Sequence, residues 1–165
     1  MGSSDQDIFF NTIKQFLLKN IPLYNFDNDL PIFIRSDASH AGAGAYLFNK
    51  KPGEKFERII EFYSKTWSKS EINYEILHKE MAAQLYCLRY WRHRILGKPC
   101  TLFTDCIALV ERKNIKNPQD RLAKFCLFFT HFGENLTLKY LKGKRNIVAD
   151  YFSRCDLNAA PKEDL

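Results

Sequence analysis

The sequence predicts an α/β fold with three antiparallel strands, a long crossover helix, and further strands that alternate with helices. Three short apolar segments follow one another between residues 31 and 65, separated only by turn-length connections. Such short connections favour antiparallel neighbours. A helical pattern over residues 74–96 then precedes another strand, and a crossover of this length makes that strand parallel to its neighbour.

Length and composition agree with one globular domain. The chain has 165 residues, of which 45% are hydrophobic, so it can build a core. Lys and Arg exceed Asp and Glu by 25 to 19, and a net charge of +6 favours a polyanionic partner. The five cysteines show no CxxC spacing, which disfavours a structural zinc site or a secreted disulfide framework. No signal peptide and no apolar run of about 18 residues is present, so we expect neither secretion nor a membrane span.

Residues 1–28 are interpreted as an N-terminal lead-in. Apolar residues at helical spacing predict a helix of about three turns, which ends by Pro22 and the polar segment 25–29. The lead-in either packs on the domain or is the tail of a preceding domain. The main domain is expected over residues 29–156, followed by a flexible C-terminal tail over residues 157–165.

Three strands are predicted at 31–37, 43–50 and 57–65. The second follows Gly42 and Gly44, and the segment 51–54, with Pro52 and Gly53, supplies the turn before the third. The helix at 74–96 shows one apolar face and ends at Gly97 and Pro99.

The second half of the chain should return to the sheet. A fourth strand is predicted at 100–105, and helices are predicted near 106–112 and 118–132. Leu136, Leu138 and Tyr140 alternate with polar residues, which predicts a half-buried strand. A last helix is expected at 146–154.

Four acidic residues lie at the ends or on the apolar sides of these elements. Asp37 and Asp105 each end a strand, Glu80 lies in an apolar sector of the long helix, and Asp150 follows three apolar residues. Taken singly, each could be a cap, a turn residue or a surface charge. Together they would repel one another without a cation, and oxygen-only ligands suit Mg²⁺ or Mn²⁺. Two such ions could activate a water and stabilise the leaving oxygen of a phosphodiester.

The residues around these acids resemble the ribonuclease H domain of retroelements, and are most similar to the Ty3/gypsy class of LTR retrotransposons. The resemblance covers about residues 20–155 and rests on motifs in the same order and spacing. These are Ser36-Asp37-Ala38-Ser39 with Gly42 and Gly44, Phe62-Tyr63-Ser64-Lys65, Glu71-Ile72-Asn73-Tyr74, Lys79-Glu80-Met81-Ala82-Ala83, Thr104-Asp105, and the segment from Gly143 to Arg154.

The resemblance implies a ribonuclease H-like fold, with a mixed five-stranded sheet flanked by helices. It also implies cleavage of the RNA strand of RNA–DNA hybrids during reverse transcription. The expected cofactor is two Mg²⁺ ions, for which Mn²⁺ could substitute. Carried over position by position, the catalytic and metal-binding residues are Asp37, Glu80, Asp105 and Asp150, with Asp37 expected to bridge both ions.

The same resemblance sets the expected partners and location. The lead-in over 22–27 is similar to the segment that joins reverse transcriptase to ribonuclease H, so a reverse transcriptase domain of the same polyprotein is the expected partner. No polymerase motif is present in this chain. The expected location is the cytoplasm, in a virus-like particle, or the nucleus.

Five further residues are candidate substrate contacts. Asn73 and Tyr74 could reach the minor groove of the hybrid, where RNA 2′-hydroxyls are displayed, or could instead be a helix cap and a core side chain. Ser39 could donate to a phosphate or serve only in a turn. Lys144 and Arg145 precede Asp150 and are placed to meet a phosphate backbone.

Two departures from the family pattern leave alternatives open. Cys106 stands where a His often follows the third acid, and the segment 142–145 lacks the His that cellular ribonucleases H carry before the last Asp. The alternatives are a catalytically weak or silent binding module retained from a retroelement, and a related nuclease that acts on DNA. The complete set of four acids argues against the binding module, because a scaffold gains nothing from repelling carboxylates.

Overall fold

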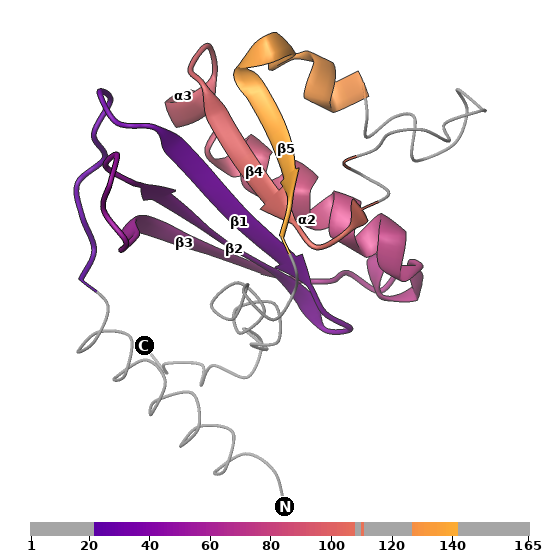
Figure 1. The fold of residues 1–165 in the computed structure, drawn as a ribbon. Helices are drawn as coiled ribbons and strands as arrows, with labels where there is room; N and C mark the ends of the chain where they lie inside the picture. Colours follow the sequence, from indigo (N-terminus) through magenta and orange to yellow (C-terminus); the bar gives the residue numbers. More distant parts are fainter. Residues whose placement is uncertain (1–21, 108–109, 111–126, 142–165) are drawn as a thin grey trace, which may run out of the picture.

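The computed structural model describes residues 22–107, 110 and 127–141, which contain a five-stranded mixed sheet (Figure 1). The strands are β1 (Ile32–Ala38), β2 (Gly42–Asn49), β3 (Arg58–Thr66), β4 (Cys100–Thr104) and β5 (Leu136–Tyr140). Their order in the sheet is β3-β2-β1-β4-β5. The β1–β2 and β2–β3 pairs are antiparallel, and the β1–β4 and β4–β5 pairs are parallel. The predicted fold class is confirmed.

Every residue of β2 is buried, and every residue of β1 is buried or half-buried, as suits strands in the interior of the sheet. On one face, Ile32 and Ile34 of β1 belong to the main core, together with Trp91 and other residues of the long helix. On the other face, Phe33 stacks on Phe48 with ring centroids 5.2 Å apart. Among the described residues, the helices α2 and α3 thus lie on one face of the sheet, and the other face carries this aromatic cluster (Figure 1).

The predicted helix over 74–96 is wrong in its extent. A 3₁₀ turn, η1 (Glu71–Asn73), comes first, and the helix consists of α2 (Ile76–Tyr90) and the short α3 (Arg92–Ile95). Trp91 separates the two with a non-helical ψ of 11°, and its fully buried indole donates from Nε1 to Glu61 Oε2 at 3.1 Å. Apolar periodicity continues through this position, so the sequence pattern does not reveal the break.

The turns and the last strand follow the sequence closely. Gly97 ends the helical segment with a φ of +76°, and Gly53 takes a φ of +83° in the turn before β3, two conformations that suit glycine. The predicted strand at Leu136–Tyr140 is confirmed. The helix predicted before Pro22 and those predicted near 106–112 and 146–154 lie wholly or largely outside the described residues, and only the end of the one at 118–132 is described. Among the described residues, no helix has the length and apolar content needed to cross a bilayer.

Alanines allow α2 to approach the sheet closely at its N-terminal half. Ala82 and Ala83 of α2 form a buried cluster with Ala38 of β1 and Ala43 of β2. Farther along α2, the larger Leu88 faces the main core instead. The helix is therefore nearest to β1 where β1 ends.

The end of the lead-in docks at the opposite end of the sheet. Asn49, which is 1% exposed, accepts a hydrogen bond from the Asp27 N–H at 3.1 Å and donates to the carbonyls of Leu30 and Pro31 at 3.3 and 3.0 Å. One buried amide thus holds three backbone groups of the segment that enters β1.

We predict that Asn49→Ala lowers the free energy of unfolding by about 1–3 kcal/mol and makes the segment before β1 sensitive to proteases. The variant leaves partly buried backbone groups without their partner. Urea unfolding and limited proteolysis measure the two effects. The matched control is Asn28→Ala, because Asn28 is exposed and accepts a hydrogen bond only from Lys98 among the described residues. Equal stability of the two variants would contradict the prediction.

Candidate metal centre

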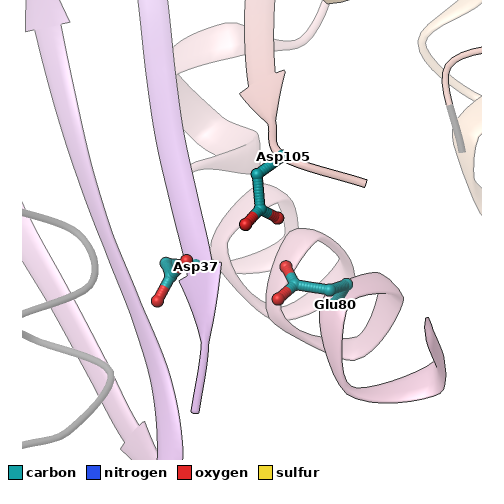
Figure 2. Close-up of side chains that lie close together, drawn as sticks. All are labelled: Asp37, Glu80 and Asp105. Carbon is teal, nitrogen blue, oxygen red and sulfur yellow. The ribbon is translucent and has the colours of Figure 1, made fainter. Parts of the chain in front are cut away.

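Three of the four predicted acids lie together at one edge of the sheet (Figure 2). Asp37 comes from the end of β1, Glu80 from the second turn of α2, and Asp105 directly follows β4. Each offers a carboxylate oxygen, and these oxygens all lie within 4.8 Å of one another. Asp150 lies outside the described residues.

The sheet topology explains why the two aspartates meet. β1 and β4 are parallel neighbours, with Arg35 in register with Phe103. Asp37 and Asp105 each lie two residues beyond this pair, so both arrive at the carboxyl edge of the sheet, where open α/β sheets bind their ligands. The alanine contacts of α2 bring Glu80 to the same point.

Glu80 carries a strong electrostatic penalty in this position. Asp37 and Glu80 are each 5% exposed. Burial raises the pKa of Glu80 to about 9, with additional contributions from the negative charges of Asp105 and Asp37. The Ala38 N–H donates to Glu80 Oε1 at 3.3 Å, while Glu80 Oε2 is buried and has no hydrogen-bond partner among the described residues. A cation would satisfy both the charge and the unpartnered oxygen.

The residues present fit a hard divalent cation. The acids line an open hollow of about 360 Å³ together with Ile76, Leu77 and other residues of the same edge. All three candidate ligands are carboxylates, the donors that Mg²⁺ and Mn²⁺ prefer. The arrangement can therefore hold a divalent ion beside an open surface.

A second polar network joins β3, η1 and α2. Glu71 of η1 accepts hydrogen bonds from Lys65 Nζ at 2.7 and 2.9 Å, from the Tyr86 hydroxyl, and from the Ser68 N–H at 2.8 Å. Although burial opposes ionisation, these donors lower the pKa of Glu71 to about 2. The network ties β3 and α2 together through one buried carboxylate.

Sequence reasoning did not single out Glu71 as a structural residue. The available signal was the spacing Ser-x-x-Glu over residues 68–71, which is typical of a capping box. In the structure the Glu71 N–H donates to Ser68 Oγ at 3.3 Å, and the Ser68 N–H donates to Glu71 in return. The local motif is thus recognisable, but its contacts with Lys65 and Tyr86 depend on tertiary structure.

The predicted substrate contacts are only partly described. Ser39 is 6% exposed, and its Oγ accepts from the N–H groups of Ala41 and Gly42 at 3.1 Å, so it orders the turn between β1 and β2. Asn73 is exposed and does not cap α2, whose N-cap is Glu75. Tyr74 is half-buried and lies edge-on to His78. Lys144 and Arg145 lie outside the described residues.

Comparison with known proteins agrees with this geometry. The family model of the RNase H-like domain found in reverse transcriptase matches residues 3–102. The Tf2-3 and Tf2-4 transposon polyproteins of Schizosaccharomyces pombe are each 35% identical to the chain over 146 residues. That alignment covers 86% of this chain and 11% of each polyprotein.

Solved structures show the same fold. A foamy viral protease-reverse transcriptase in complex with double-stranded DNA has a TM-score of 0.64 at 17% identity, covering 86% of this chain and 27% of that one. RNase H1 from the archaeon Halobacterium salinarum NRC-1 has a TM-score of 0.56 at 13% identity, covering 79% of this chain and 98% of that one.

A mixed sheet in this strand order, with carboxylates at the edge where β1 and β4 end, defines a ribonuclease H-like domain. The chain belongs to the RNase H-like domains of reverse transcriptases, in the Ty3/gypsy class of LTR retroelements. It spans about a tenth of the length of the curated polyproteins that it matches.

We predict that Glu80→Gln stabilises the metal-free protein at pH 8 by on the order of 2 kcal/mol. The pKa of Glu80 is raised from about 4.3 in the unfolded chain to about 9 in the folded one, so the folded protein favours the protonated carboxyl. The free energy of unfolding that this protonated group contributes is fully present below pH 4 and is lost as the pH rises toward 9. Glutamine stays neutral, so the variant should gain most at high pH. Urea unfolding in a chelator at pH 4 and pH 8 measures this. A variant less stable than the wild type at pH 8 would refute it.

We predict the opposite pH dependence for Glu71→Gln. The lowered pKa of Glu71 means that its stabilisation is present above about pH 4.3 and is lost as the pH falls toward 2. The variant should lose on the order of 2 kcal/mol at pH 7, and the difference should shrink as the pH approaches 2. Denaturant unfolding across this range tests it, with the exposed Glu75→Gln as the control. A loss that does not depend on pH would show that charge is not the cause.

Proposed function

We propose that this chain is a divalent-metal-dependent endonuclease that hydrolyses the RNA strand of RNA–DNA hybrids during reverse transcription. The observation that carries the proposal is the convergence of the carboxylates of Asp37, Glu80 and Asp105 in one open hollow. Family membership supports the same reaction class, since the chain belongs to the RNase H-like domains of reverse transcriptases.

Two Mg²⁺ ions, or Mn²⁺ in their place, would supply an activated water and would stabilise the charge that develops on the leaving oxygen. In this scheme Asp37, Glu80 and Asp105 would hold the ions through their carboxylates. Asp150 is proposed as the fourth ligand. The Ala38 N–H then keeps one oxygen of Glu80 oriented, so the acid binds without a large rearrangement.

The substrate assignment rests on charge and on family membership. The net charge of +6 favours a nucleic acid, and a 2′-hydroxyl is the group that distinguishes RNA from DNA. One foamy viral protease-reverse transcriptase with this fold was solved in complex with an RNA/DNA hybrid. We propose Ser39, Asn73, Tyr74, Lys144 and Arg145 as substrate contacts, and a reverse transcriptase domain as the partner.

We predict that the purified chain cuts the RNA strand of a labelled RNA–DNA hybrid only when Mg²⁺ is present. Asp105→Asn should lower the rate about 100-fold or more, because the loss of a charged ligand removes several kcal/mol of charge stabilisation. Gel analysis of the labelled RNA strand measures the cut.

The matched control is Glu134→Gln, an exposed acid of η2 (Gly133–Asn135), which should cut at the wild-type rate. Duplex RNA and duplex DNA of the same sequence test the substrate assignment. Absence of a Mg²⁺-dependent cut, or an unchanged rate in Asp105→Asn, would reject the enzyme and leave a binding module.

A further inference from the structure

A fully buried amide lies on α2 one helical turn after Glu80 of the candidate metal centre. Gln84 of α2 is 0% exposed, and neither its Oε1 nor its Nε2 has a hydrogen-bond partner among the described residues. A buried amide without partners costs on the order of 1–3 kcal/mol, and an apolar side chain at this position would avoid that cost. The amide therefore calls for an explanation beyond packing.

The position of Gln84 on α2 points it at the sheet beside Glu80. Residues four and seven apart share a helix face, so Gln84 follows Glu80 on the strip that continues through Cys87 and Trp91. Cys87 and Trp91 pack in the main core with Ile34, and the neighbouring Ala83 packs against Ala38. Gln84 thus lies between the apolar core and the acids.

A second unpartnered polar atom lies one helical turn away. Glu80 Oε2 is buried and also has no hydrogen-bond partner among the described residues. Side chains at i and i+4 of a helix are neighbours, and a glutamine amide can reach a carboxylate at that spacing. Two unpartnered groups of complementary chemistry therefore adjoin each other, with an N–H donor on one and a carboxylate acceptor on the other.

We propose that Gln84 is a positioning residue for Glu80, and that its Nε2–H donates to Glu80 Oε2 when a divalent ion is bound. This inference rests on the metal-dependent function proposed above. With the Ala38 N–H on Oε1, the carboxylate is held from both sides, and each oxygen keeps a lone pair for the ion. Hydrogen-bond partners that orient a metal ligand in this way typically change metal affinity 10- to 100-fold when they are removed.

The test replaces the amide by an apolar side chain of similar length, Gln84→Met. Mn²⁺ affinity, measured by electron paramagnetic resonance of the free ion, should weaken about tenfold. Stability in a chelator should not fall, because the variant removes an unpartnered buried amide. The matched control is Cys87→Ala on the same strip, which should lower stability by creating a cavity and leave Mn²⁺ affinity within about twofold.

A measurement on the wild type removes any dependence on how well the variant folds. The side-chain amide resonance of Gln84 should shift during a Mg²⁺ titration, with the same midpoint as the Asp37 and Asp105 signals. If the wild type binds Mn²⁺ but Gln84→Met binds it equally well, or if the amide resonance stays fixed, the positioning role is overturned and the metal centre stands. If the wild type binds no divalent ion, the proposed function itself fails, and this inference fails with it.

Discussion

The confinement of three carboxylates in one partly buried hollow is the constraint on which the rest of the structure depends. Two ionised carboxylates at about 4.8 Å repel each other by roughly 3 kcal/mol at the effective dielectric constant of a protein. A backbone hydrogen bond such as that from Ala38 to Glu80 returns only about 1 kcal/mol. The acids are therefore held together by the packing of the elements that carry them, and a cation would remove the cost.

That packing has two recognisable components. The alanines of α2, β1 and β2 let the helix approach the strands, which sets the distance between Glu80 and Asp37. The buried carboxylate of Glu71 binds Lys65 of β3 and Tyr86 of α2, and so joins the helix that carries Glu80 to a strand that carries none of the acids. The alanine contacts bring Glu80 close to Asp37, and the hydrogen bonds of Glu71 fix α2 relative to β3. Both use residues that carry none of the proposed chemistry.

Local patterns and simple topology were sufficient to predict the antiparallel strands β1 to β3 and the parallel direction of β4. Short turns made β1 to β3 antiparallel, and the crossover made β4 parallel to its neighbour. They did not show that β4 lies beside β1, the condition for Asp37 and Asp105 to meet, which the structure supplies. The break at Trp91 could not be predicted, since the apolar periodicity runs through it and Trp91 packs in a core formed by elements that are distant in the sequence. Gln84 was missed for a related reason: an isolated amide in an apolar run carries no signal until its burial is known.

The two ends of β1 have different roles, and the length of the strand separates them in space. At one end Ile32 is in register with Asn49, the residue that holds the lead-in, and at the other Asp37 is in register with Gly44. Five residues of extended strand place these points roughly 17 Å apart. The described segment that enters β1 is thus attached at the end of the sheet away from the acids. The strand that fixes the segment before it therefore also separates that attachment point from the carboxylates.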